Sequence, residues 1–60
     1  MEDREALQRT LDIARRTLST LEEQAAGYTV LTIPAHLVNE IEAKRADVAR
    51  LEARLAGGSA

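Results

Sequence analysis

Two stretches of the chain place apolar residues at alternating intervals of four and three. In the first stretch these residues are Leu7, Leu11, Ala14, Leu18, Leu21 and Ala25. In the second they are Leu37, Ile41, Val48, Leu51 and Leu55, and Lys44 is the polar residue that occupies the remaining position of the repeat. This spacing places one apolar seam along one side of an α-helix, as in coiled coils. The pattern predicts two helices, over about residues 3–26 and 34–56.

Residues at the ends of the first stretch support its bounds. Asp3 is a candidate N-cap, and the carboxylates of Glu2 and Glu5 suit the positive end of the helix dipole. Gly27 is expected to end the helix in the left-handed conformation, which glycine adopts without a steric penalty.

The second stretch also has recognisable ends. Pro34 suits the first turn of a helix, where its missing N–H has no helical partner, and Thr32 or Ile33 is the candidate cap. Residues 57–60 begin with two glycines and read as a flexible tail, or as a linker cut from a longer protein.

The connection over residues 27–33 is short, and a short link between helices makes them antiparallel neighbours. Folding the chain there pairs residues whose numbers sum to about 62, such as Leu11 with Leu51 and Leu21 with Ile41. The predicted fold is therefore all-α: one antiparallel, coiled-coil-like hairpin over residues 1–56.

Extending this register to the flanks of the seam predicts ion pairs between the helices. Asp12 is expected to face Arg50, and Arg15 to face Asp47. Both pairs join opposite charges, and exposed pairs of this kind are each worth about 0–1 kcal/mol.

A second, weaker apolar stripe indicates that one hairpin does not complete the core. It comprises Ala6, Thr10, Ile13, Thr17 and Thr20 in the first helix, and Val38, Ala49, Ala53 and Ala56 in the second. An apolar face of this width is typical of four-helix bundles. Because chains of this size without disulfides usually need oligomerisation, the simplest prediction is a twofold dimer of hairpins.

The connection itself is apolar, although helix-joining turns are normally polar. Tyr28, Val30, Leu31 and Ile33 are the residues concerned. One interpretation is that they fold back and cap the end of the core. The other is that some of them, Tyr28, Val30 and Leu31 in particular, contact a partner, and both can hold together.

Composition narrows the possible functions. The chain of 60 residues has no cysteine, one aromatic residue and a formal net charge of −2. Disulfides and thiolate metal sites are excluded, and no basic surplus suggests nucleic-acid binding. No apolar run approaches the length of a membrane span, and no signal peptide is recognisable. We expect a cytoplasmic protein.

Few residues suggest chemistry. His36 and Glu40 lie one helical turn apart in the second helix. Two such residues are far more often an exposed surface pair than a catalytic dyad or half of a metal site. Lys44 on the seam is expected to extend its ammonium group to the surface, or to fix the register of the helices at some cost in stability, rather than to react. The basic pairs at residues 15–16 and 44–45 are interleaved with acids and read as solvated helix surface. We expect no enzyme, cofactor or metal.

Four segments resemble a short helical module of bacterial multidomain signalling and defence proteins: Leu21–Tyr28 (LEEQAAGY), Thr32–Leu37 (TIPAHL), Glu40–Glu42 (EIE) and Val48–Glu52 (VARLE). That module accompanies STAND-type NTPases, TIR or caspase-like effector domains, or trypsin-like proteases. The resemblance implies an adaptor role through contacts between like helices, without catalysis in this segment.

Two functional hypotheses remain open at this point. The first is a homotypic module that self-associates, as a dimer in the simplest case. The second is a heterotypic hairpin, antitoxin-like or chaperone-like, that binds a second helical protein or sequesters an effector domain and gains helix on binding.

Overall fold

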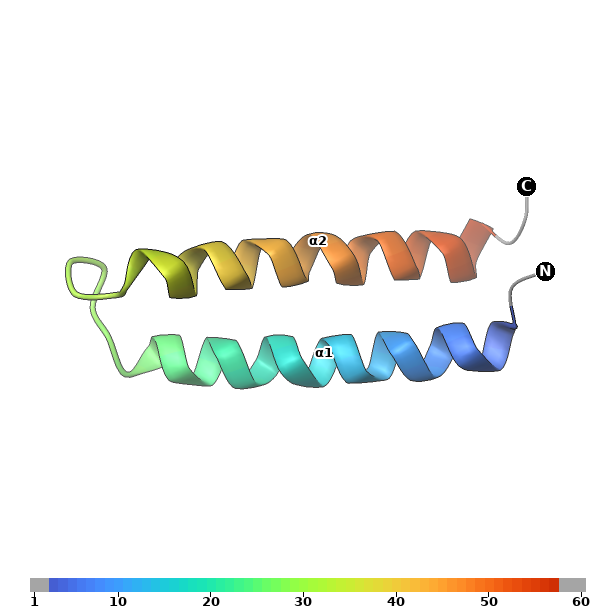
Figure 1. Ribbon diagram of the computed structural model, residues 1–60, viewed down its shortest axis with the longest axis horizontal. Helices are drawn as coiled ribbons and strands as arrows, with labels where there is room; N and C mark the ends of the chain where they lie inside the picture. Colours follow the sequence, from blue (N-terminus) through green and yellow to red (C-terminus); the bar gives the residue numbers. More distant parts are fainter. Residues whose placement is uncertain (1–2, 58–60) are drawn as a thin grey trace.

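The computed structural model describes residues 3–57, and within this range it contains two helices and no strand. Helix α1 spans Arg4–Ala26 and helix α2 spans Ala35–Gly57. The helices lie side by side and antiparallel, so that the start of α1 and the end of α2 lie together at the end opposite the turn (Figure 1). The predicted all-α hairpin is confirmed. The molecule is elongated, with principal extents of 44 × 17 × 14 Å.

Helix α1 begins where its local sequence predicted. The Oδ1 atom of Asp3 accepts a hydrogen bond of 3.0 Å from the N–H of Glu5, and the Asp3 carbonyl accepts one of 2.9 Å from Leu7. The side chain thus satisfies one of the N–H groups that have no partner inside the helix. Asp3 is the N-cap of α1.

The other end of α1 differs from the prediction. Gly27 has φ −79° and ψ −5°, which is right-handed helical geometry and not the expected left-handed one. Its N–H donates to the carbonyl of Gln24 (3.2 Å), and the N–H of Tyr28 donates to Ala25 (3.0 Å). The helix therefore ends by tightening into bonds three residues apart, which satisfy its last carbonyls without a left-handed residue.

Helix α2 begins one residue later than predicted, at Ala35. The carbonyl of Pro34 accepts hydrogen bonds from Leu37 (3.1 Å) and Val38 (3.3 Å), so Pro34 stands immediately before the helix rather than in its first turn. Thr32 does not cap α2; its hydroxyl is bonded within the turn instead. The predicted tail lies outside the described residues except for Gly57, which is the last residue of α2.

The two threonines of the turn bond to one another. The N–H of Thr29 donates to the Oγ1 of Thr32 (2.8 Å), and the two hydroxyl oxygens are 2.9 Å apart. In return, the N–H of Thr32 donates to the Oγ1 of Thr29 (3.2 Å) and also to the Thr29 carbonyl (3.1 Å). Reciprocal side-chain bonds of this kind fix a turn through local polar groups. We call Thr29 and Thr32, joined by these bonds, the threonine clamp; Val30 and Leu31 lie between them at the tip of the turn.

The core follows the predicted seam, but it is thin. Four side chains are buried: Leu11 (2% exposed), Ala14 (9%), Leu37 (6%) and Ile41 (8%). The other predicted core residues, Leu7, Leu18, Leu21, Ala25, Val48, Leu51 and Leu55, are half-buried. Lys44 is also half-buried, and its Nζ lies 3.7 Å from Oδ2 of Asp47. Two helices meeting along one seam leave the edges of that seam in contact with water.

The ion pairs between the helices are not the predicted ones. Arg15 pairs with Glu52 (2.7 Å) and not with Asp47. A second bridge joins Arg45 to Glu22 (3.0 Å). Arg15 directly follows the seam residue Ala14, whereas Asp47 directly precedes the seam residue Val48. The two side chains therefore lie on opposite flanks of the seam. In antiparallel helices each flank meets the corresponding flank of its neighbour, so the seam register does not carry over to flanking residues.

Candidate interaction surface

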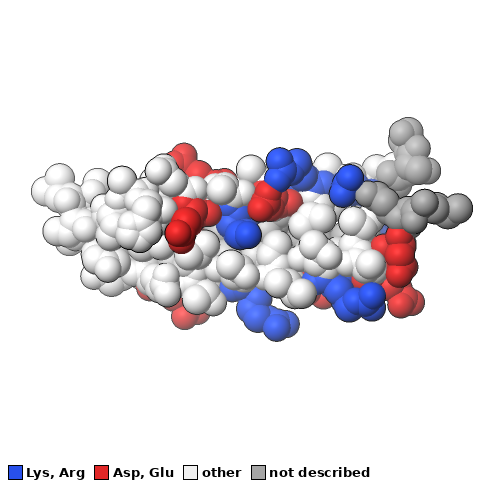
Figure 2. Space-filling view, viewed as in Figure 1, with Lys and Arg blue, Asp and Glu red and all other residues white. Residues whose placement is uncertain are grey.

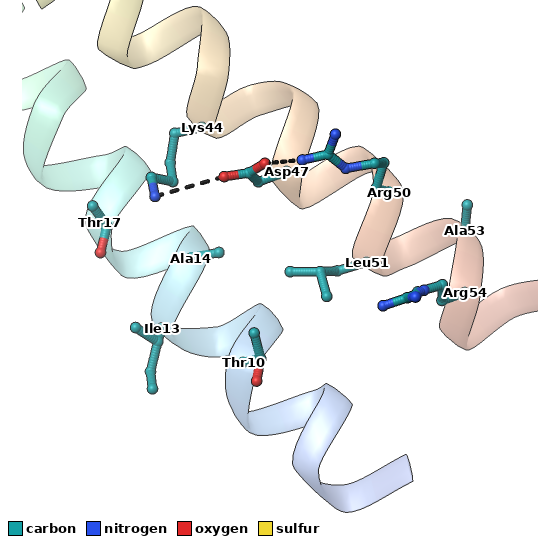
Figure 3. A pocket seen from close by; sticks show the side chains of 10 residues that line it. All are labelled: Thr10, Ile13, Ala14, Thr17, Lys44, Asp47, Arg50, Leu51, Ala53 and Arg54. Atoms are coloured by element: carbon teal, nitrogen blue, oxygen red, sulfur yellow. Dashed lines mark hydrogen bonds and ion pairs between the residues drawn. The ribbon is translucent and has the colours of Figure 1, made fainter. Parts of the chain in front are cut away.

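A groove of about 590 Å³ runs between the two helices on one flank of the seam (Figure 3). Helix α1 lines it with Thr10, Ile13, Ala14 and Thr17. Helix α2 lines it with Lys44, Asp47, Arg50, Leu51, Ala53 and Arg54. We call it the Ile13 groove, because Ile13 is its large apolar side chain with the greatest exposure, at 62%.

The two walls of the Ile13 groove differ in chemistry. The α1 wall carries the hydroxyl and methyl groups of Thr10 and Thr17, the methyl group of Ala14 and the branched alkyl group of Ile13, and no charge. On the α2 wall, the carboxylate of Asp47 bonds to both Lys44 and Arg50 (Figure 3). The side chain of Leu51 points from α2 toward α1 and forms the floor with Ala14. The groove therefore has an apolar floor, a neutral wall and a charged wall.

The sequence-predicted second stripe does not form one surface. Thr10, Ile13, Thr17 and Ala53 line the Ile13 groove. Ala56 instead lines a smaller groove, of about 400 Å³, on the flank that carries Arg15 and Glu52. The two grooves lie on opposite flanks of the seam because of helical geometry. Thr17 lines the Ile13 groove and Arg15 lines the smaller one, and these two residues are about 200° apart around α1. Of the other stripe residues, Ala6 and Val38 are half-buried, and Thr20 and Ala49 are exposed.

On α1 the stripe extends one position beyond the five predicted residues. Gln24 continues it, four residues after Thr20, and is exposed. The complete set is Ala6, Thr10, Ile13, Thr17, Thr20 and Gln24, again at intervals of four and three. We call this set the uncharged stripe. Its spacing equals that of the seam, and the signal for Gln24 in the sequence is the absence of charge at the next position of the repeat. Helix α1 thus carries two adjacent faces with coiled-coil periodicity.

The tip of the turn is a second exposed apolar feature. Val30 and Leu31 are 93% and 95% exposed, and Tyr28 is 47% exposed. Only Ile33 of the apolar turn is half-buried, so capping of the core by Val30 and Leu31 is excluded. No charged residue occurs between positions 24 and 39, and the turn end of the molecule is uncharged in surface view (Figure 2).

The residues singled out for possible chemistry lie on open surface. His36 and Glu40 are both exposed on α2. Among residues 3–57, no three His, Cys, Asp or Glu side chains are grouped closely enough to hold a metal ion. Within the same range, neither helix is long and apolar enough to cross a bilayer.

Comparisons with known proteins add no relative: no family model, curated protein or solved structure matches the chain.

Proposed function

We propose that this chain is a non-catalytic interaction module that associates with a second copy of itself to form a four-helix bundle. The observation that carries the proposal is the surface it leaves uncovered. A compact monomer of 6.6 kDa is expected to expose about 3,900 Å². The hairpin exposes 4629 Å², about 700 Å² more than a compact monomer. A standard interface covers about 800 Å² on each partner.

The shape of the molecule supports the same proposal. Its radius of gyration is 13.9 Å, whereas a compact domain of this length has about 10.4 Å. Placing a second hairpin against the Ile13 groove would thicken the rod and cover half-buried seam residues such as Leu51. The gain would be apolar burial, which is the dominant favourable term in association.

The test is sedimentation equilibrium combined with circular dichroism over a wide range of concentration. We expect a helical dimer that loses helix on dilution, because dilution removes the partner that completes the core. A monomer that stays fully helical when dilute would refute self-association.

The tip of the turn favours a second candidate, a heterotypic binding hairpin. Val30 and Leu31 are held by the threonine clamp in a defined conformation, and their side chains are almost wholly exposed. Self-association through the Ile13 groove would leave this tip free for another protein. A poorly helical monomer at every concentration would favour the heterotypic function over the homotypic one.

The setting of this module in a bacterial signalling or defence protein is part of the proposal and rests on the sequence resemblance. In such a protein, self-association of hairpins would bring attached effector domains together. Fusing the hairpin to a monomeric reporter protein tests this: the reporter should dimerise only when the hairpin is intact.

A further inference from the structure

Self-association leaves the orientation of the two hairpins open. In one arrangement the twofold axis is perpendicular to the helices, α1 packs against α1 of its partner, and the two turns lie at opposite ends. In the other the axis runs along the helices, α1 packs against the partner's α2, and both turns lie at the same end. We infer that this chain forms the first arrangement, with α1 against the partner's α1 and the turns at opposite ends; this inference rests on the proposed function.

The chemistry of the Ile13 groove supplies the first argument. The uncharged stripe occupies α1 alone, whereas α2 presents Asp47, Arg50 and Arg54 on the same flank. Packing α1 against its own copy brings neutral residues together and places Ile13 near the middle of the contact. Packing α1 against the partner's α2 would cover the Lys44–Asp47–Arg50 ion pairs with Thr and Ile side chains, which take charged groups out of water and give them no new polar contact, whereas the first arrangement sets the charged α2 against the equally charged α2 of the partner.

The pattern of the uncharged stripe fits this pairing. Its intervals of four and three read the same in both directions. Two antiparallel copies of α1 therefore meet stripe to stripe when paired residue numbers sum to about 30, so that Thr10 faces the partner's Thr20 and Ile13 faces the partner's Thr17. In this register the outer flank of the stripe pairs Arg9 with the partner's Glu23, an opposite charge, at both ends of the contact, and sets Arg16 against the partner's Arg16 at its centre.

The distribution of charge along the rod supplies an independent argument. The half next to the turn, residues 17–44, carries four carboxylates and one lysine, for a net charge of −3. The described part of the other half, residues 3–16 and 45–57, carries seven arginines against five carboxylates, for a net charge of +2. Turns at opposite ends place the acidic half of each hairpin on the basic half of its partner. Turns at the same end place acidic on acidic and basic on basic, which is repulsive.

Disulfide trapping tests this orientation, since the chain has no cysteine of its own. The variants are Thr10→Cys, Thr20→Cys and Arg54→Cys, and the first two replace exposed residues of the uncharged stripe. A disulfide requires Cα atoms within about 7 Å. In the inferred arrangement a residue at position 10 lies about 15 Å from its own copy, since ten residues separate it from position 20.

We expect an equimolar mixture of Thr10→Cys and Thr20→Cys to cross-link under oxidation about tenfold faster than either variant alone, because pairing in the dimer raises their effective concentration. Faster cross-linking of Thr10→Cys with Arg54→Cys would overturn the orientation and leave self-association standing. A dimer in which Thr10→Cys and Thr20→Cys do not couple would also overturn it. Absence of a dimer of the unmodified chain in sedimentation would refute the proposed function itself, and the orientation with it.

Discussion

Replacing Ile13 with aspartate places a charge in the middle of the uncharged stripe while leaving the hairpin itself little changed. Ile13 is 62% exposed in the hairpin, so few of its intrachain contacts are lost. Isoleucine and aspartate also have similar helix propensities. The effect of Ile13→Asp should therefore fall on association rather than on folding of the single chain.

The size of the effect follows from the exposed fraction of Ile13. Full burial of an isoleucine side chain is worth about 1.5–3 kcal/mol. Covering the 62% that the hairpin leaves exposed is then worth about 1–2 kcal/mol per copy, or about 2–4 kcal/mol for both copies in a twofold dimer. Losing it weakens Kd by about 30- to 1000-fold. Desolvation of the two introduced carboxylates adds to this loss.

Sedimentation equilibrium of Ile13→Asp at several concentrations measures the change in Kd. Ser19→Asp is the matched control, because Ser19 is exposed on the same helix and lies about 120° around it from Ile13. The control should keep the dimer constant of the unmodified chain to within a few-fold. If Ile13→Asp dimerises as tightly as Ser19→Asp, then the uncharged stripe is not the interface.

Three further predictions concern the hairpin itself, each measured by thermal and urea unfolding at one fixed protein concentration. Gly27→Ala should raise the free energy of unfolding by about 0.4–1 kcal/mol. Gly27 has right-handed geometry, and an added Cβ would lie 3.5 Å from the Gln24 carbonyl oxygen, which is an ordinary contact. A loss of stability would instead indicate that Gly27 is left-handed. Leu11→Ala should cost about 2–5 kcal/mol because Leu11 is 2% exposed, whereas Leu31→Ala, at 95% exposed, should stay within about 0.5 kcal/mol; equal effects would contradict the described core. Thr32→Val should lower the free energy of unfolding by about 0.5–1.5 kcal/mol, because it removes the hydroxyl bonds to Thr29. Thr32→Ser keeps the hydroxyl and should retain most of the stability. An equal loss in both variants would exclude the threonine clamp as the cause.

Features that depend on neighbouring residues were predictable from the sequence. The seam at intervals of four and three predicted both helices to within a residue or two, and Asp3 predicted the start of α1, because a cap acts through bonds to residues two or three positions away. The short connection predicted the antiparallel hairpin. The sequence also showed that the turn is apolar, but it did not show whether the side chains of the turn pack inward.

The tertiary structure decided how residues beside the seam are distributed. A shift of one position moves a side chain about 100° around a helix, so the flank on which a residue lies depends on how both helices are rotated toward each other. This rotation separated Ala56 from Ile13 and paired Arg15 with Glu52. It also left the uncharged stripe of α1 beside a charged stretch of α2. The exposure of Val30 and Leu31 was likewise decided there, because the hydroxyl bonds between Thr29 and Thr32 hold the tip away from a core that ends at Ile33.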